Sequence, residues 1–284
     1  MTANAAVGSE RGESVVEQVR ERYGKIAEGR SGGCCGPSTA ATSCCGPAPS
    51  ASVRLGYKAR ELAVVPDGAD LGLGCGAPVH HLALKPGETV LDLGSGGGID
   101  VFLGAKEVGP SGRVIGVDMT PAMLERARSN AAKGGYTNVE FREGRLEHLP
   151  VEDASIDAVT SNCVINLVPD KAAVFREISR VLKPGGRMVI SDVVLDGRLP
   201  AAIENDVLAY VGCIAGAAQR EAYFGQLRAA GLGDVEILQD VDSLTQWAAA
   251  APEDAQALAE RTGVSPAEVA GKVRSVTYRA RKTQ

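Results

Sequence analysis

The sequence has few aromatic residues and lacks long apolar runs and long basic runs. Phe, Tyr and Trp make up 4% of the 284 residues, so the core must be built mainly from Val, Leu, Ile and Ala. No apolar stretch reaches the roughly eighteen residues that a membrane-spanning helix needs. The net charge is −5, and the absence of clustered Lys and Arg argues against a nucleic-acid-binding protein.

The sequence also has few histidines and none of the cysteine pairs that are typical of zinc sites. The first 28 residues are polar and carry no apolar signal segment, so we expect a cytoplasmic protein in which cysteines stay reduced. The seven cysteines are then ligands, redox groups or buried apolar residues rather than a disulfide scaffold. No Cys-x-x-Cys pair occurs, and the three histidines are not placed as zinc partners: His80, His81 and His148.

The first 52 residues form one predicted part of the chain. Residues 1–13 are expected to be disordered, and a short amphipathic helix should follow, opened by a capping-box pair, Ser14 and Glu17. Residues 31–52 are rich in Gly, Ser, Ala, Pro and Cys, which predicts a mobile loop because such a segment buries little apolar surface. Cys-Cys-Gly-Pro occurs twice in this segment.

Short apolar strands alternate with helices over the next part, residues 53–195. Helices are predicted after Thr120, with Pro121 in the first position, and after Asp170. This alternation predicts an α/β fold with a doubly wound, mostly parallel, Rossmann-like sheet. Strands are expected over residues 89–93, 114–118, 139–141, 156–162 and 187–192, and the inner face of the second helix should carry Val174, Phe175, Ile178, Val181 and Leu182.

The third part, residues 196–284, is dominated by helical patterns and ends in a possible closing strand over 274–281. We expect this part to be an appendage that completes the active site.

A glycine loop directly after the first strand indicates a nucleotide-type cofactor. Its spacing is Gly94-x-Gly96-x-Gly98, with Asp92 two residues before the first glycine. Dinucleotide sites instead use Gly-x-Gly-x-x-Gly around a pyrophosphate. Asp118 ends the second strand, where an acid can accept hydrogen bonds from both ribose hydroxyls.

This loop, the acid after the second strand, and Leu-Lys-Pro-Gly-Gly at 182–186 resemble class I S-adenosylmethionine (SAM)-dependent methyltransferases. The alternative is a Rossmann-like domain that no longer binds a ligand. The resemblance implies SAM as cofactor. It implies cofactor contacts from ten residues: Asp92, Gly94, Ser95, Gly96, Gly98, Asp118, Met119, Leu146, Glu147 and Asn162.

Three cysteines lie outside the low-complexity loop: Cys75, Cys163 and Cys213. Each alone is compatible with a buried apolar cysteine. However, Cys163 ends the fourth strand, and open α/β sheets bind ligands at the carboxyl ends of their strands. Cys75 lies in a glycine-rich loop that can fold over the same edge. Converging thiolates would favour a thiophilic centre.

The motifs around these cysteines are similar to those of arsenite (As(III)) SAM methyltransferases of the bacterial type. They are Gly-Cys-Gly at 74–76, Ser-Asn-Cys-Val-Ile-Asn-Leu-Val-Pro-Asp-Lys at 161–171, and Gly-Cys at 212–213, within a resemblance over roughly residues 53–240. It implies that Cys163 and Cys213 hold As(III), that Cys75 participates, and that residues 196–284 complete the arsenic site. The chain departs from parts of the family at Leu73, where animal and algal members tend to have an aromatic, and in having no cysteine after Cys213.

A fourth arsenic ligand is implied in the amino-terminal segment. Cys34, Cys35, Cys44 and Cys45 compete for this role, and spacing to Cys75 favours Cys45. The paired cysteines are also compatible with a redox-sensitive linker. A mobile loop that captures arsenite and delivers it to the rigid site is the alternative.

The resemblance implies methyl transfer from SAM to thiolate-bound arsenic, as in arsenic detoxification. The arsenic lone pair would attack the methyl carbon, so no general base is required, and catalysis would come from positioning and desolvation. Two cysteines would then reduce the product by forming a disulfide, which a glutathione- or thioredoxin-type reductant resets. The expected partners are arsenite and methylated arsenicals. We expect no nucleic acid or membrane partner, and we expect a monomer.

Two other functions remain open at this point. One is a SAM-dependent methyltransferase for another small molecule, which would give the three cysteines no role. The other is a non-catalytic arsenic-binding protein, which the intact glycine loop and Asp118 argue against.

Overall fold

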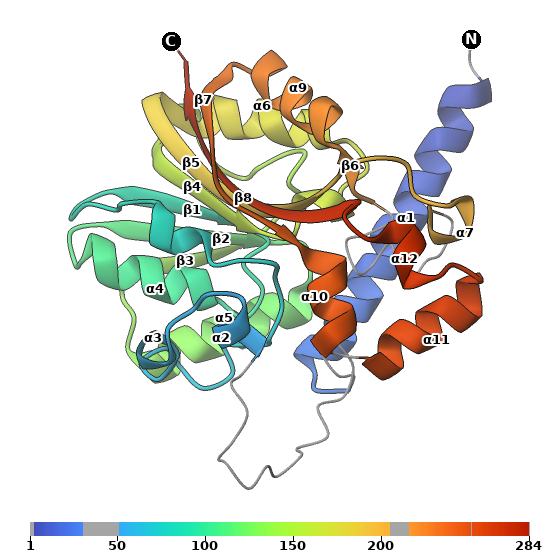
Figure 1. Ribbon diagram of the computed structural model, residues 1–284. Coiled ribbons are helices and arrows are strands. Elements are labelled where there is room, and N and C mark those ends of the chain that lie inside the picture. Colours follow the sequence, from blue (N-terminus) through green and yellow to red (C-terminus); the bar gives the residue numbers. More distant parts are fainter. Residues whose placement is uncertain (1–2, 31–50, 205–215, 251, 284) are drawn as a thin grey trace, which may run out of the picture.

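A single mostly parallel sheet runs through the part of the chain that the computed structural model describes, residues 3–30, 51–204, 216–250 and 252–283. Its strand order is β3-β2-β1-β4-β5-β8-β7, with β6 paired to β5 (Figure 1). Strands β1 to β5 are parallel neighbours, whereas β8 is antiparallel to β5 and β7. The strands are β1 Thr89–Leu93, β2 Arg113–Asp118, β3 Val139–Glu143, β4 Ile156–Asn162, β5 Leu182–Leu195, β6 Ala218–Gln219, β7 Leu232–Asp242 and β8 Val273–Lys282.

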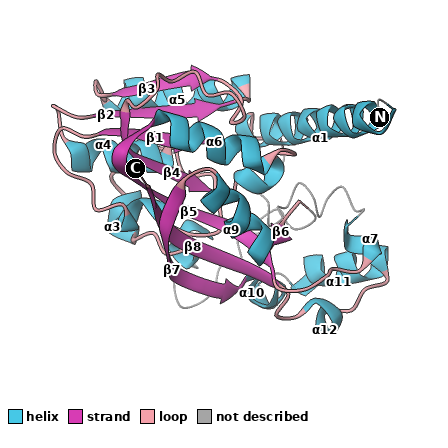
Figure 2. Cartoon of the chain, turned by 90° about the horizontal axis from the view of Figure 1, so that it is seen from above, coloured by secondary structure: helices cyan, strands magenta, loops and turns pink. Residues whose placement is uncertain are grey.

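Helices cover both faces of the sheet, as a parallel sheet requires. In Figure 1, α4 and α5 lie on one face and α6 and α9 on the other. Figure 2 shows the amino-terminal part of α1 extending away from the sheet. The helices are α1 Ala3–Ala27, α2 Ala51–Arg54, α3 Ala59–Leu62, α4 Ile99–Val108, α5 Pro121–Gly134, α6 Lys171–Val181, α7 Ala201–Glu204, α9 Arg220–Ala229, α10 Ser243–Ala250, α11 Pro252–Thr262 and α12 Pro266–Val269, with 3-10 turns η1 Pro78–His81 and η2 Ile165–Leu167.

Successive side chains of the central strands feed two different cores. Val90 of β1 packs in the core of α4 and α5, whereas its neighbour Leu91 packs in the core of α6 and α9. This division follows from the alternation of side chains along a strand. It explains why adjacent residues of β1 are both apolar. The predicted fold class is confirmed.

Four of the scarce aromatic residues form one cluster in the core of α6 and α9. Phe175, Tyr223, Phe224 and Tyr278 pack edge to face, with ring centroids between 5.0 and 6.0 Å apart. They join α6, α9 and β8, and edge-to-face pairs stabilise beyond their buried area. The aromatic cluster therefore attaches the carboxyl-terminal strand to the rest of the sheet.

Several local predictions are confirmed. Asp170 caps α6 by accepting a hydrogen bond from the Ala173 N–H at 2.9 Å. The expected inner face of α6, including Phe175, is fully buried, but Leu182, predicted as its last residue, is instead the first residue of β5. The predicted fourth strand coincides with β4, and β8 is the expected closing strand. Helix α5 starts at Pro121, although Thr120 makes no side-chain capping bond.

The amino-terminal prediction was wrong. Helix α1 already begins at Ala3, so the expected disorder over 1–13 is replaced by helix from residue 3. Alanines near the start favour helix. Ser14 therefore lies inside α1, where its hydroxyl accepts from the Gln18 amide, and is not a capping residue. Residues 31–50 of the expected loop lie outside the described residues, whereas its last two predicted residues, 51 and 52, belong to helix α2.

Strand β7 was not expected within the helical third part of the chain. Its side chains are mostly half-buried or exposed, so it lacks a clear apolar alternation. Pairing with β8 selects the strand conformation here. The division of the chain at residues 52 and 195 stays a prediction. Among the described residues, no helix combines the length and apolarity needed to cross a membrane.

Replacing Phe175 should strongly destabilise the protein. Phe175 is fully buried, and its ring lies 5.2 Å from that of Tyr223. We expect Phe175→Ala to lower the free energy of unfolding by about 3–5 kcal/mol, because it removes this contact and leaves a cavity. Urea denaturation measures the change. Val64→Ala, at a side chain that is 55% exposed, should shift it by less than about 0.5 kcal/mol. Equal effects would contradict the described core.

Candidate functional site

A cavity of about 170 Å³ lies at the carboxyl edge of the sheet. Its walls come from the glycine loop after β1, the residues after β2 and β3, the end of β4, and the loop that carries Gly74. Helix α1 contributes Val16, Val19 and Tyr23 to the lining. The cavity therefore lies where ligands of open α/β sheets bind, and α1 covers part of it.

The glycine loop has a backbone that side chains would disrupt. Gly94 and Gly96 have φ angles of 67° and 51°, a region that costs other residues energy. A Cβ atom on Gly94 would lie 2.5 Å from Val164. The N–H groups of Gly94 and Ser95 both donate to the Val117 carbonyl, which fixes the loop against β2.

Asp118 connects this loop to the end of β2. Its carboxylate accepts hydrogen bonds from the Gly96 N–H at 3.0 Å and the Thr120 N–H at 2.8 Å. The carboxylate lines the cavity and is buried. The expected contact with ribose hydroxyls stays a prediction.

Three carboxylates, Asp92, Asp100 and Asp118, are buried together around the cavity. Burial, followed by the charges of Asp100 and Asp118, raises the pKa of Asp92 well above its ordinary value. Burial also raises the pKa of Asp118, and that of Asp100 to about 7. A ligand that carries positive charge would favour the ionised forms of all three.

Tyr57 and Asp100 were missed by the sequence analysis. The Tyr57 hydroxyl donates to Asp100 Oδ1 at 2.8 Å and accepts from Asn162 Nδ2 at 3.0 Å. Asp100 had a usable signal, since it lies in the first turn after the glycine loop. Tyr57 had none, because it is 43 residues from Asp100 and 105 from Asn162 in the chain.

Cys163 and Cys75 lie together at this edge. Cys163 directly follows β4, lines the cavity and has a left-handed φ of 60°. Its N–H donates to the Ser191 carbonyl at 2.8 Å. Both cysteines are half-buried, neither is in a disulfide, and both pack against the same apolar cluster, which contains Val19 and Leu167. The structure thus brings together two of the predicted arsenic ligands.

The other predicted site residues divide into those that line the cavity, one that does not, and those outside the described residues. Met119, Leu146, Glu147, Ser95 and Asn162 line the cavity, whereas Gly98 is not among its lining residues and begins α4 with a φ of 95°. Leu73, which stands where other sequences have an aromatic, also lines it. The remaining predicted ligands lie outside the described residues: Cys34, Cys35, Cys44, Cys45 and Cys213.

No group of three His, Cys, Asp or Glu side chains suited to a metal ion occurs in the described part of the chain. The imidazole of His80 instead pairs with Glu61 at 2.8 Å. We therefore assign the histidines no role in the site.

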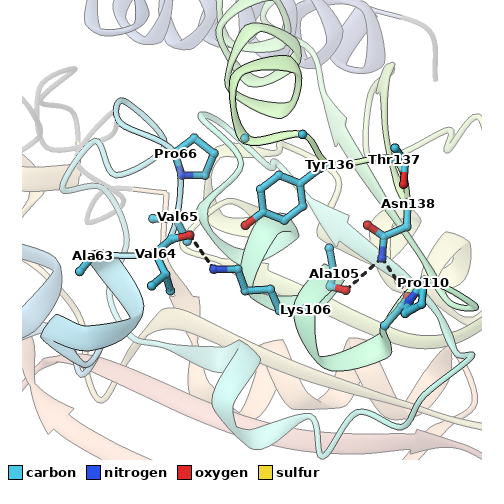
Figure 3. Close-up of a pocket in the computed structure, with 13 residues that line it drawn as sticks. Ala63, Val64, Val65, Pro66, Ala105, Lys106, Pro110, Tyr136, Thr137 and Asn138 are labelled. Atoms are coloured by element: carbon cyan, nitrogen blue, oxygen red, sulfur yellow. Dashed lines mark hydrogen bonds between the residues drawn. The ribbon is translucent and has the colours of Figure 1, made fainter.

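A second, shallow pocket lies at the opposite, amino edge of the sheet (Figure 3). The Lys106 ammonium donates to the Val64 carbonyl, and the Asn138 amide donates to the carbonyls of Ala105 and Gly109. Among the described residues, no carboxylate and no thiol lines this pocket. It therefore lacks the chemistry that the carboxyl edge offers.

The residues at the carboxyl edge fit SAM. Its ammonium and sulfonium groups are cations, which suit the three buried carboxylates. The Ser95 hydroxyl is buried without a hydrogen-bond partner among the described residues, so it is available to a ligand. The glycine loop allows close approach of a ligand to the backbone.

A side chain at Gly96 should block the cofactor. An added Cβ would meet only Met123, 4.0 Å away, so the protein has room for it, but the atom would enter the ligand's space. We expect Gly96→Val to weaken SAM binding at least about 100-fold in calorimetry, through this clash and the strained φ. Gly225→Val, in open space on α9, is the matched control and should bind normally. Retained binding in Gly96→Val would contradict the site.

SAM affinity should rise with pH. Raised carboxyl pKa values mean that the ligand-free protein still holds protons near neutral pH, and these must leave before the carboxylates can attract a cation. With the pKa of Asp100 at about 7, affinity should increase roughly eightfold between pH 6 and 7.5. Calorimetry measures it. In ligand-free protein the same group should lower stability as pH rises from about 4 to 7.

Asp100→Asn should flatten this pH dependence. Asp157→Asn is the control, because Asp157 pairs with Lys183 at the amino edge of the sheet and should leave the profile unchanged. A flat profile in the unmodified protein would show that these carboxylates are already ionised.

Comparisons with known proteins agree with this site. A family described as a methyltransferase domain matches residues 84–251. An arsenite methyltransferase of Halobacterium salinarum is 49% identical over 251 residues, covering 83% of this chain and 62% of the relative. One from Aquipseudomonas alcaligenes is 37% identical over 235 residues, covering 79% and 64%. The chain thus spans slightly less than two thirds of the length of these two relatives.

A solved structure extends the similarity to three dimensions. The arsenic(III) S-adenosylmethionine methyltransferase from Chlamydomonas reinhardtii superimposes with a TM-score of 0.55 and 33% identity, covering 84% of this chain and 75% of that one. Fold, glycine loop and thiol positions therefore lead to the same assignment. The chain belongs to the arsenite methyltransferase family, within the SAM-dependent methyltransferases.

Proposed function

We propose that this protein transfers methyl groups from SAM to trivalent arsenic held by its own thiolates. The observation that carries the proposal is the position of Cys163, which lines the cofactor cavity and packs against the same apolar cluster as Cys75. Thiolates are soft ligands and suit a thiophilic centre. The relatives named arsenite methyltransferases support the choice of arsenite.

The proposed arsenic ligands are Cys75, Cys163, Cys213 and one amino-terminal cysteine. Among the four amino-terminal candidates, Cys45 is preferred by its spacing to Cys75. A different methyl acceptor would leave the half-buried thiols at the cavity without a function. A protein that only sequesters arsenic would have no use for the buried acids and the glycine loop.

SAM, when bound, supplies an electrophilic methyl group. Asp92, Asp100 and Asp118 would hold its cationic and ribose ends, and Met119, Leu146 and Glu147 would flank the nucleoside. Asn162 and Cys163 are consecutive residues at the end of β4, so one strand end carries both a cavity residue and a thiol. This arrangement would fix the thiol-bound substrate relative to the cofactor.

The protein need not remove a proton from the nucleophile, because trivalent arsenic bound by thiolates keeps a lone pair. In agreement, no histidine lines the described cavity. Apolar side chains around the thiols, including Val19 and Leu167, would keep water away from the reacting groups. Positioning and exclusion of water are therefore the proposed sources of rate enhancement.

A thiol reductant completes the proposed cycle. Methyl transfer to arsenic gives a formally pentavalent product, and two cysteines would return it to the trivalent state by forming a disulfide. A glutathione- or thioredoxin-type thiol would then reduce that disulfide. This chemistry suits the reducing cytoplasm, where we propose that the protein acts as a monomer.

Arsenic speciation tests the proposal. The purified protein is incubated with SAM, arsenite and a thiol reductant, and products are separated by chromatography with arsenic detection. We expect methylated arsenicals. Cys163→Ser should reduce their formation at least about 100-fold, because serine is a poor arsenic ligand, while SAM affinity stays within about threefold. Cys213→Ser should behave in the same way.

Two results would redirect the assignment. SAM binding without methylated arsenic would point to another nucleophile, or to sequestration where arsenite binds tightly. Loss of SAM binding in both serine variants would show that these cysteines support the fold of the cofactor site rather than arsenic.

A further inference from the structure

We propose that Tyr57 is a positioning residue that acts on Cys75 through Asn162, and so couples the cofactor cavity to the arsenic-binding thiol. The inference rests on the proposed function, because it assigns Cys75 to arsenic. It concerns a residue that no motif of the sequence singles out.

Tyr57 is placed to bridge two sides of the cavity. It is 2% exposed, and its hydroxyl makes two hydrogen bonds, donating to Asp100 at 2.8 Å and accepting from Asn162 at 3.0 Å. Both partners line the cavity. Asp100 belongs to the first turn of α4 and Asn162 to the end of β4. The hydroxyl therefore holds Asn162 in one orientation relative to α4.

Asn162 in turn holds the loop that carries Cys75. Its Oδ1 accepts from the Cys75 N–H at 2.9 Å, and its Nδ2 also donates to the Gly76 carbonyl at 2.7 Å. A Cβ on Gly74 would lie 2.8 Å from the Asn162 amide, so loop and side chain are in close contact. All the donors of this amide are engaged, and rotating it would break bonds to Tyr57 and to the loop together.

The loop around Cys75 depends on such bonds because it belongs to no helix or strand. The second bond to Cys75 comes from Ser275 of β8, whose hydroxyl donates to the Cys75 carbonyl at 2.7 Å. Among the described residues, two side chains, from β4 and β8, thus bond to the backbone of Cys75. Only the Asn162 bond connects directly to a residue of the cofactor cavity.

A cofactor that contacts Asn162 and Asp100 favours the arrangement in which the Cys75 loop is held. Arsenic bound at Cys75 favours the same arrangement. Because coupling between two binding equilibria is reciprocal, each ligand should strengthen the binding of the other. Tyr57 transmits this effect by keeping Asn162 in the orientation that serves both sites.

Tyr57→Phe tests the inference, because it removes the hydroxyl and keeps the ring. The dissociation constant of arsenite is measured by equilibrium dialysis of the full chain, with and without saturating S-adenosylhomocysteine, which cannot donate a methyl group. In the unmodified protein we expect the nucleoside to strengthen arsenite binding by roughly 5- to 100-fold. In Tyr57→Phe this factor should fall below about twofold, while both ligands still bind.

Tyr278→Phe is the matched control. Tyr278 is equally buried, and its hydroxyl donates to Tyr223 at 3.2 Å rather than to a cavity residue. The coupling factor should remain as in the unmodified protein, even where the melting temperature drops as much as in Tyr57→Phe. A merely structural role of Tyr57 would instead lower stability and leave the coupling factor intact, which would overturn the inference.

If Tyr57→Phe fails to fold, Gly74→Ala tests the contact between Asn162 and the Cys75 loop instead. The added methyl would push the loop away from Asn162, so the coupling factor should fall here too, and a retained factor would overturn the inference. Unmodified protein that binds both ligands without coupling would also overturn it. Protein that binds the nucleoside but no arsenite would instead refute the proposed function itself.

Discussion

The burial of three carboxylates at one edge of the sheet is the constraint on which the rest of this site depends. Asp92 lies next to the end of β1, Asp100 lies in the first turn of α4, and Asp118 is the last residue of β2. The chain topology therefore brings all three to one edge of the sheet. Like charges buried at close range are unfavourable unless they are protonated, bonded or neutralised. Two of the three receive hydrogen bonds from the loop backbone or from Tyr57. Positive charge on a bound SAM would supply the remaining compensation.

A second buried polar network supports the turn that carries Cys163. Asn166, fully buried on this turn, donates to Asp192 at 2.8 Å, and the Tyr223 hydroxyl donates to the same carboxylate at 3.1 Å. Tyr223 also belongs to the aromatic cluster that attaches β8. The few tyrosines of this chain therefore combine packing with hydrogen bonding. They fix, from the far side of the sheet, the backbone next to a thiol.

Local signals explain how much of this architecture the sequence could predict. Glycine spacing located the cofactor loop, Asp170 located the start of α6, and apolar runs located β1 and β4, because each signal acts within a few residues. The position of Cys163 at the cavity followed from the rule for strand ends. Cofactor contacts and arsenic ligands remain proposals, although the structure places most of the described candidates around one cavity.

The missed features depend on contacts between distant parts of the chain. Tyr57 reaches the site through partners 43 and 105 residues away, and β7 is a strand because β8 lies beside it. No short pattern encodes either. The helix α1 was misjudged for a different reason, since a polar and charged composition suggested disorder where helix propensity prevailed.

The order of the strands has a consequence for how the protein is made. Strand β8, close to the carboxyl terminus of this sequence, lies between β5 and β7 rather than at the edge of the sheet. During synthesis on the ribosome, β5 therefore lacks its neighbour until residues 273–282 have emerged, and Cys75 lacks the bond from Ser275, 200 residues further along. Long-range closure of this kind slows folding. A nascent chain that lacks β8 would consequently hold the Cys75 loop without one of its two side-chain bonds.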